Sequence, residues 1–342
     1  MTPAIFGIAG PSLSDEEKAF FKDVDPAGYI LFGRNCETRD QMRRLTDDLR
    51  ALQGREATLV SIDQEGGRVA RIKPPEWPAF PAGAAFDALF EAAPASAMQA
   101  ARLNAQAMGR ELAEVGVTVD YHPPLDVRRR GANDVIGDRA LGHEPLRVAA
   151  LGRSILEGLE AAGVLGCIKH MPGHGRTTTD THLAMPTVTA SVEELEEDLA
   201  PFRALSDTPI GMTGHLLFTA WDEDNPATLS STIIRDVIRG DIGFDGLLLT
   251  DDIDMQALSG TIPERSERAL AAGCDIVLNC WAKMDDQRGI VERAGPMRAD
   301  TRRRMDTVLE RIAAPAQDLP PVAELLAERD ALFAAANVPM AA

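Results

Sequence analysis

A short polar segment in the middle of the chain concentrates groups that can move protons. Residues 169–186 read KHMPGHGRTTTDTHLAMP, and three of the six histidines of the chain belong to this segment. His170 and His174 have the spacing of two zinc ligands on one helical face. Pro172 and its neighbouring glycines are incompatible with a helix there, and no cysteine or further carboxylate completes a zinc set nearby. We therefore expect a loop that binds no metal ion.

Asp180 and His182 form a carboxylate–imidazole pair within this loop. In such a pair the carboxylate accepts a hydrogen bond from one ring nitrogen and leaves the other nitrogen free to carry a proton. An imidazole titrates near neutral pH without further help. Gly173 and Gly175 suit a loop that moves while it carries a functional group. The pair resembles a catalytic triad without its serine, and we predict that it acts as a general acid/base.

A second candidate is Asp251, which ends an apolar run. Residues 237–258 read VIRGDIGFDGLLLTDDIDMQAL, a pattern that predicts one carboxylate at the end of a buried strand. Neighbouring strand residues point to opposite faces, so Asp252 and Asp254 are expected to cap the next helix or support the loop. A carboxylate nucleophile with a proton shuttle is the apparatus of retaining glycoside hydrolysis, and His182 would replace the usual second carboxylate.

Two further segments contain groups that can bind sugar hydroxyls. Residues 58–71 read TLVSIDQEGGRVAR, with Asp63 as a hydrogen-bond acceptor and Arg68 or Arg71 as a donor. Taken alone, Asp63 could equally cap a helix before a turn. Arg139, within VIGDRALG, could hold either a substrate oxygen or a carboxylate side chain. For both residues, the two roles stay open on these segments alone.

Eight short apolar runs rich in β-branched residues alternate with longer segments of helical periodicity. Near-continuous apolar strands are typical of a parallel sheet covered on both faces. The alternation predicts an α/β fold, a (β/α)8 TIM-type barrel, and a doubly wound open sheet is the competing interpretation. No GxGxxG fingerprint follows the first run, which counts against the open sheet. The predicted strands are residues 4–9, 28–32, 58–63, 117–121, 164–170, 210–215, 246–251 and 275–280.

Ionisable residues stand at the carboxyl ends of these strands, the end at which barrel enzymes build their active sites. Burying so many of them unpaired would be costly, so we expect them to meet in one site. They are Asp63, Asp126, Lys169 with His170, His215 and Asp251. The predicted helices include residues 37–53, 96–115, 145–162, 191–205, 232–239 and 264–272, and one or two more are expected outside the barrel after residue 300, divided at Pro320 and Pro321.

The composition excludes several classes of protein. The 342 residues include 35 Lys+Arg and 53 Asp+Glu, and the resulting net charge of −18 repels nucleic acid. No stretch reaches the roughly 18 apolar residues of a membrane span, and the N-terminal apolar run is too short for a signal peptide. The four cysteines are widely spaced and predict free thiols in a reducing compartment. A cytoplasmic protein without membrane or nucleic-acid partners is expected.

Together these segments resemble family 3 of the glycoside hydrolases, and within it the bacterial β-N-acetylglucosaminidases that recycle cell-wall fragments. The matching motifs, in order, are SIDQEGGRV, VIGDR, KHMPGHG followed by DTH, and GFDGLLLTDD, and the similarity covers roughly residues 5–300. The resemblance implies a single catalytic domain over residues 1–342. Its barrel would span about 1–300 and extra C-terminal helices about 300–342, with no second domain to supply an acid/base glutamate.

The resemblance also implies a role for each matching residue, and it implies neither a cofactor nor a metal ion. Asp251 is the expected nucleophile, and His182 is the expected general acid/base, assisted by Asp180. The sequence departs from the family pattern at Met171 and at Ala140–Leu141, which affects fine substrate preference rather than the reaction type. The terminal sugar is expected to be bound by Asp63, Arg71, Arg139, Lys169 and His170.

The implied activity is retaining exo-hydrolysis of terminal β-linked GlcNAc through a glycosyl-aspartate intermediate. The implied substrates are peptidoglycan-derived muropeptides such as GlcNAc-1,6-anhydro-MurNAc, with or without peptide, and the expected enzyme is a monomer. A competing hypothesis is a family 3 β-glycosidase of broader specificity that accepts glucosides or xylosides. Two hypotheses from different classes are a barrel lyase with Lys169 as a Schiff-base nucleophile and a sugar-binding protein without catalytic activity.

Overall fold

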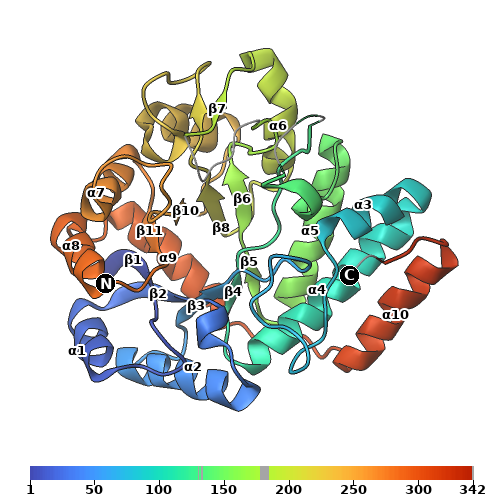
Figure 1. Cartoon of the computed structure of the whole chain (residues 1–342), viewed down its shortest axis with the longest axis horizontal. Coiled ribbons are helices and arrows are strands. Elements are labelled where there is room, and N and C mark those ends of the chain that lie inside the picture. The colour runs from blue at the N-terminus through green and yellow to red at the C-terminus, as the bar shows by residue number, and fades with distance from the viewer. Residues whose placement is uncertain (130, 132–133, 178–184, 341–342) are drawn as a thin grey trace.

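The barrel closes through one interrupted strand. The computed structural model describes residues 1–129, 131, 134–177 and 185–340. Within these residues, nine parallel strands pair in the order β5–β4–β3–β2–β1–β11–β10–β8–β6. β5 (Leu165–Gly166) and β6 (Ile168–Met171) stand at opposite ends of this order, yet only Cys167 separates them in the chain. The sheet is therefore a closed eight-stranded barrel, which confirms the predicted (β/α)8 fold (Figure 1).

Each of the eight predicted strands overlaps an observed one, but several end earlier than their apolar runs. β4 (Val119–Asp120), for example, ends shortly before Pro123 and Pro124, which have no N–H to donate to a ladder. The other barrel strands are β1 (Thr2–Gly7), β2 (Pro26–Leu31), β3 (Leu59–Ile62), β8 (Ile210–Thr213), β10 (Leu247–Asp252) and β11 (Ile276–Asn279). A separate small sheet pairs β7 (Thr187–Val188) with β9 (Leu217–Phe218).

Helices surround the strands, as the alternating pattern predicted (Figure 1). The start of α6 (Val192–Ala204) is encoded locally, because the Ser191 hydroxyl accepts the N–H of Glu194 and the Glu194 carboxylate accepts the N–H of Ser191 at 2.8 Å. The helix predicted over 232–239 is a π-helical segment, Ile233–Asp241. The other helices around the barrel are α1 (Asp15–Val24), α2 (Arg39–Gln53), α3 (Gly83–Ala92), α4 (Pro94–Glu114), α5 (Pro145–Ala161), α7 (Ile262–Ala272) and α8 (Met284–Ala294).

Two C-terminal helices occupy different places. α9 (Ala299–Ile312) contributes Met305 and Val308 to the apolar cluster inside the barrel. It therefore covers the end at which the barrel strands begin, which we call the base. α10 (Val322–Ala335) lies along α4 on the outside (Figure 1), where Arg329 donates to the Asn104 side chain at 2.7 Å. Within the described part of the chain, no helix is long and apolar enough to cross a bilayer.

Asp275 ties α9 to the base of the barrel. The residue directly precedes β11 and is buried. Its Oδ1 accepts hydrogen bonds from the Thr301 hydroxyl at 2.6 Å and from Arg304 at 3.2 Å. Its Oδ2 accepts from Arg239 at 2.7 Å and from the N–H of Leu248 at 3.0 Å. One carboxylate thus neutralises guanidinium groups from two separate elements.

We predict that Asp275→Ala lowers the free energy of unfolding by about 3 kcal/mol or more, because the variant leaves partly buried guanidinium groups without their counter-charge. Urea unfolding followed by circular dichroism at pH 7 measures the change. The control is Asp306→Ala, an exposed position of α9, where a change within about 0.5 kcal/mol is expected. Equal stability of the two variants would contradict the role of Asp275.

Candidate active site

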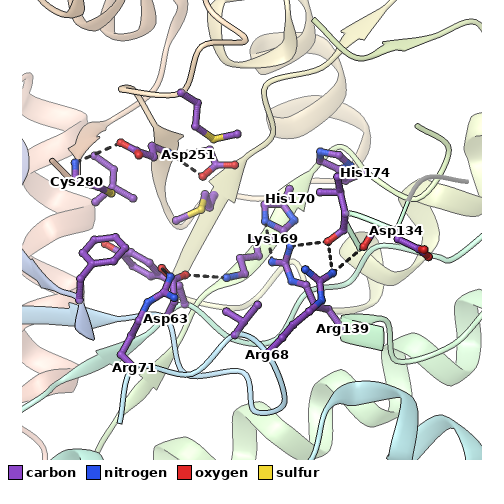
Figure 2. A pocket seen from close by; sticks show the side chains of 18 residues that line it. Asp63, Arg68, Arg71, Asp134, Arg139, Lys169, His170, His174, Asp251 and Cys280 are labelled. Atoms are coloured by element: carbon purple, nitrogen blue, oxygen red, sulfur yellow. Dashed lines mark hydrogen bonds and ion pairs between the residues drawn. The ribbon is translucent and has the colours of Figure 1, made fainter. Parts of the chain in front are cut away.

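A pocket of about 520 Å³ opens at the carboxyl ends of the barrel strands (Figure 2). Asp180 and His182, the predicted acid/base pair, lie outside the described residues. The other residues predicted to act in catalysis or sugar binding all line this pocket, whereas Asp126 and His215, which were also expected in the site, contact its lining residues His170 and Asp252. The predicted residues that line it are Asp63, Arg71, Arg139, Lys169, His170 and Asp251.

A buried glutamate that the sequence did not single out holds two of these residues in place. Glu65 is only 4% exposed, and its two carboxylate oxygens accept from the Arg139 guanidinium at 2.7 and 2.8 Å. The Lys169 Nζ lies 2.7 Å from the same carboxylate. Burial alone would raise the pKa of Glu65, but the charges of Arg139 and Lys169 outweigh burial and hold this pKa well below its usual range.

The same interactions keep both cations charged. Burial alone would lower the pKa of Lys169 and of Arg139, but Glu65 raises both. Of the two roles open to Arg139, the structure therefore shows binding of a carboxylate side chain. One NH group of this guanidinium also lies 3.5 Å from Nε2 of His170, at the pocket wall. Two signals in the sequence could have found Glu65, which stands two residues after the strand-end Asp63 and inside the matching motif SIDQEGGRV.

Asp63 lies between two cations and remains partly open to the pocket. Its Oδ1 is 3.1 Å from Nζ of Lys169, its Oδ2 is 3.1 Å from Arg71, and the side chain is 18% exposed. Of the two arginines proposed as sugar-binding donors, Arg71 is the one that pairs with Asp63. Arg68 instead binds Asp138 at 2.7 Å and so connects the two loops that flank the pocket.

His170 is oriented by a buried carboxylate. Its Nδ1 lies 2.7 Å from Oδ2 of Asp126. The other oxygen of Asp126, Oδ1, accepts the backbone N–H groups of His170 at 3.3 Å and of His174 at 2.7 Å. Burial alone would raise the pKa of Asp126, but the two imidazoles and the backbone N–H of His174 lower it. An ionised Asp126 can only accept, so Nδ1 of His170 donates to it, and Nε2 is the ring nitrogen that faces Arg139.

His174 is a neutral neighbour of His170. Burial lowers the pKa of His174 to about 4, so this imidazole is uncharged at pH 7. The two rings pack edge to face with their centroids 5.7 Å apart, and Nδ1 of His174 lies 3.2 Å from the Thr177 hydroxyl. The loop that leaves β6 is therefore anchored at the pocket up to Thr177.

Asp251 is an ionised carboxylate near the end of β10. Burial alone would raise its pKa, but the imidazoles of His170 and His215 and the N–H of Asp252 lower it. That N–H donates to Oδ1 of Asp251 at 2.7 Å. His215 in turn has Nε2 at 2.9 Å from the Asp252 carbonyl and Nδ1 at 2.8 Å from the Thr228 hydroxyl. A carbonyl only accepts, so Nε2 carries the proton and His215 holds the backbone next to Asp251.

Asp252 supports its own loop, which is one of the two roles expected for it, and Asp254 holds the loop after β11, a contact that was not predicted. Oδ1 of Asp252 accepts the N–H of Asp254 at 3.1 Å, and Oδ2 of Asp254 accepts the N–H groups of Cys280 at 3.0 Å and Trp281 at 3.3 Å. Burial and the neighbouring Asp254 raise the pKa of Asp252 to about 8. Strict alternation, however, was wrong here. Asp251 and Asp252 both line the pocket, because the β10–β11 register shifts before Asp252.

The departures from the family pattern lie in the core. Met171, Ala140 and Leu141 are all buried, and none of them lines the pocket. Gly211 of the neighbouring strand β8 leaves room for the Met171 side chain, because a Cβ there would lie 2.3 Å from the Met171 methyl group. Packing therefore explains these positions without a change in the polar wall.

Known proteins are similar to this chain over most of its length. Residues 6–314 match the glycosyl hydrolase family 3 N-terminal domain. A β-hexosaminidase of Bordetella avium is 36% identical over 81% of this chain and 80% of its own length. NagZ of Neisseria gonorrhoeae, solved in complex with N-trifluoroacetyl-D-glucosamine, is 31% identical with a TM-score of 0.83, covering 98% of each chain. A family 3 β-N-acetylglucosaminidase of Paenibacillus is 30% identical with a TM-score of 0.86, and this chain, 96% of which is covered, spans 66% of it.

We predict that Glu65→Gln lowers the free energy of unfolding at pH 7 by about 3 kcal/mol, because Lys169 and Arg139 lose their shared counter-charge. The folded-state pKa of Glu65 lies below the unfolded value of about 4.3, so its stabilisation is present above that pH and is lost as the pH falls. The difference between wild type and variant should therefore shrink in urea unfolding at pH 3.5. The exposed Glu223→Gln serves as control. A difference independent of pH would contradict the prediction.

Proposed function

The chain belongs to family 3 of the glycosyl hydrolases, as a β-hexosaminidase, and from this premise we propose that it is a retaining exo-β-N-acetylglucosaminidase. The observation that carries the proposal is the ionised Asp251, which lies in one pocket with a wall of paired polar groups. We further propose that its substrates are peptidoglycan-derived muropeptides such as GlcNAc-1,6-anhydro-MurNAc, and that it acts as a cytoplasmic monomer.

The polar wall suits a terminal sugar that carries no charge. Asp63 offers partly exposed oxygens to sugar hydroxyls, and Arg71, Lys169 and Arg139 supply donors beside it. His170 adds the ring nitrogen Nε2 to this wall, because its Nδ1 is held by Asp126. Every cation of this wall is paired with a carboxylate, so the pocket offers hydrogen bonds rather than a strong net charge. The net charge of −18 repels anions at long range, but it does not repel an uncharged sugar, which such a site binds through local hydrogen bonds.

The proposed reaction has two steps. Asp251 attacks the anomeric carbon while the bond to the leaving oxygen breaks, and His182, assisted by Asp180, donates a proton to that oxygen. Water then attacks the glycosyl-aspartate and gives its proton to His182, so the configuration is retained. Thr177 is the last described residue before the segment that contains Asp180 and His182. Its hydroxyl contacts His174, which belongs to the pocket wall.

The environment of Lys169 argues against a Schiff-base lyase. A nucleophilic lysine needs a lowered pKa so that its amine is uncharged. Here Glu65 and Asp63 outweigh burial and raise the pKa of Lys169, which keeps the ammonium protonated.

The substrate class is tested by incubation with GlcNAc-1,6-anhydro-MurNAc, followed by mass spectrometry and NMR of the products. Release of β-configured GlcNAc supports the proposal, and equally fast cleavage of aryl β-glucosides and aryl β-GlcNAc favours the broader β-glycosidase.

For the nucleophile, we predict that Asp251→Asn lowers kcat on an aryl β-GlcNAc glycoside by about a thousandfold or more, because the amide cannot form the glycosyl intermediate. Steady-state release of the aryl group measures this. The exposed Asp224→Asn controls for the loss of one negative charge and should behave as wild type. Activity of the Asp251 variant near that of wild type would remove the basis of the proposed mechanism.

For the acid/base, we predict that His182→Ala separates substrates by leaving group. Cleavage of a disaccharide should fall by about 10²–10⁴-fold, since the leaving oxygen then departs without a proton. The first step with a dinitrophenyl glycoside should fall far less, because that group leaves without protonation. Pre-steady-state release of the phenol distinguishes the steps. A loss of the same size for both substrates would assign His182 to binding or folding instead.

A further inference from the structure

The loop that leaves β6 begins with a stem, residues 173–177, that is closely packed on two sides. On one side, Gly175 leaves no room for a Cβ against the carbonyl oxygen of Val127 in the loop after β4. On the other side, a Cβ at Gly173 would lie 3.1 Å from the Cβ of Asp198 in α6. The stem therefore passes between the loop after β4 and helix α6.

Asp198 joins this stem to the helix through a buried carboxylate. Its Oδ2 accepts a hydrogen bond from Nε of Arg176 at 2.5 Å. A terminal nitrogen of the same guanidinium donates to the backbone carbonyl of Glu194, also in α6, at 2.6 Å. A planar guanidinium held at two points has a fixed orientation, so Arg176 attaches the stem to α6 in one position.

A second arginine reaches the same carboxylate from the loop after β4. One terminal nitrogen of Arg129 lies 3.5 Å from Oδ2 of Asp198, and the other lies 2.6 Å from Glu197. Burial raises the pKa of Asp198, and the guanidinium groups of Arg176 and Arg129 counteract this only in part. The other oxygen of Asp198, Oδ1, has no hydrogen-bond partner among the described residues. The ionised form of Asp198 therefore depends on these two arginines.

Helix α6 is a firm support for this anchor. Leu195, Leu199 and Phe202 bury one face of the helix in an apolar cluster that it shares with α5. Neither Asp198 nor Arg176 lines the sugar pocket. An effect of this ion pair on the reaction must therefore pass through the loop that it holds.

The anchor lies close in the chain to the proposed acid/base pair. Arg176 precedes Asp180 by four residues and His182 by six. Six residues span at most about 20 Å when fully extended, so a fixed Arg176 limits the positions that the His182 imidazole can occupy. A catalytic group that is held near its target reaches it at a lower entropic cost.

We propose that Asp198 is a positioning residue for the general acid/base and that it acts through its ion pair with Arg176. The inference rests on the proposed function, because that function assigns proton donation to His182. Loss of the pair releases the stem from α6, so the imidazole meets the leaving oxygen less often. Attack by Asp251 is not affected, because β10 and His215 hold this carboxylate independently of α6.

The test compares two substrates in Arg176→Met, a variant that removes the ion pair and keeps a long side chain. Cleavage of GlcNAc-β-1,4-GlcNAc should fall by about tenfold or more, because a small displacement of a catalytic group is costly. Pre-steady-state release of dinitrophenol from its β-GlcNAc glycoside should stay within about twofold of wild type, because this group leaves without a proton. The matched control is Arg203→Met, which removes the ion pairs of an α6 arginine with Glu196 and Asp241 and should change neither rate.

Asp198→Asn and the double variant with Arg176→Met complete a double-mutant cycle. The asparagine keeps the size of the side chain and removes its charge. If Asp198 acts through Arg176, the double variant should show the same ratio of disaccharide to dinitrophenyl rates as either single variant, because each change breaks the same pair. If Asp198→Asn does not fold, Arg176→Met and its control decide the matter by themselves.

The outcomes separate this inference from the proposed function. Equal losses on both substrates, or no loss on either, overturn the positioning role of Asp198. A change of the same kind in Arg203→Met assigns the effect to a weakened α6 and also overturns it. His182→Ala, measured alongside, tests the acid/base assignment itself. Failure of the wild-type enzyme to cleave either substrate overturns the proposed glycosidase.

Discussion

The active-site end of this barrel depends on one buried carboxylate. Glu65 neutralises Arg139 and Lys169, two cations that would otherwise be buried beside each other. A buried charge of this kind is tolerated only when it is paired and hydrogen-bonded, so the three side chains form a single unit. That unit joins the loop after β3, the loop before α5 and strand β6. The positions of Asp63 and His170 follow from it, because both contact its cations.

The charges of this unit and the groups around it determine which side chains are ionised. Lys169 and Arg139 stay charged next to Glu65, so the Asp63 carboxylate lies beside permanent positive charge. Asp126 fixes the tautomer of His170, and His215 holds the backbone next to Asp251. Burial alone would raise the pKa of Asp251, but the groups around it lower this pKa, and the carboxylate remains ionised. An ionised carboxylate in this buried position is thus a property of the surrounding network rather than of the aspartate alone.

The barrel separates stability from chemistry along its axis. At the base, Asp275 joins α9 to two other elements, and apolar residues of α9 fill the end of the interior. At the opposite end, polar groups from several loops converge on the pocket, as in other barrel enzymes. The buried donors of Arg71 and Trp77, for which the described residues supply no acceptor, lie at that polar end. Loop residues there can change specificity without disturbing the base.

The sequence by itself determined the architecture and the positions of most polar strand ends, because periodicity and strand-end placement are local properties of the chain. Eight apolar runs between helices predict the barrel, and strand-end placement predicts Asp63, Lys169, His170 and Asp251 as pocket residues. The tertiary structure alone decided the pairings. Glu65 binds Arg139 across 74 positions of the chain, and Lys169 reaches Asp63 across 106. Spacing in the sequence cannot predict such contacts, because barrel closure sets the distances between loops.

Local geometry decided the rest in the same way. Arg71 rather than Arg68 pairs with Asp63, because the Arg68 guanidinium binds Asp138 instead. Asp252 faces the pocket because a register shift interrupts the alternation that the sequence pattern assumes. The identities and order of the residues are therefore written in the chain. Which charges meet, and so which of them are ionised, is decided only when the folded barrel brings their loops together in a low-dielectric site.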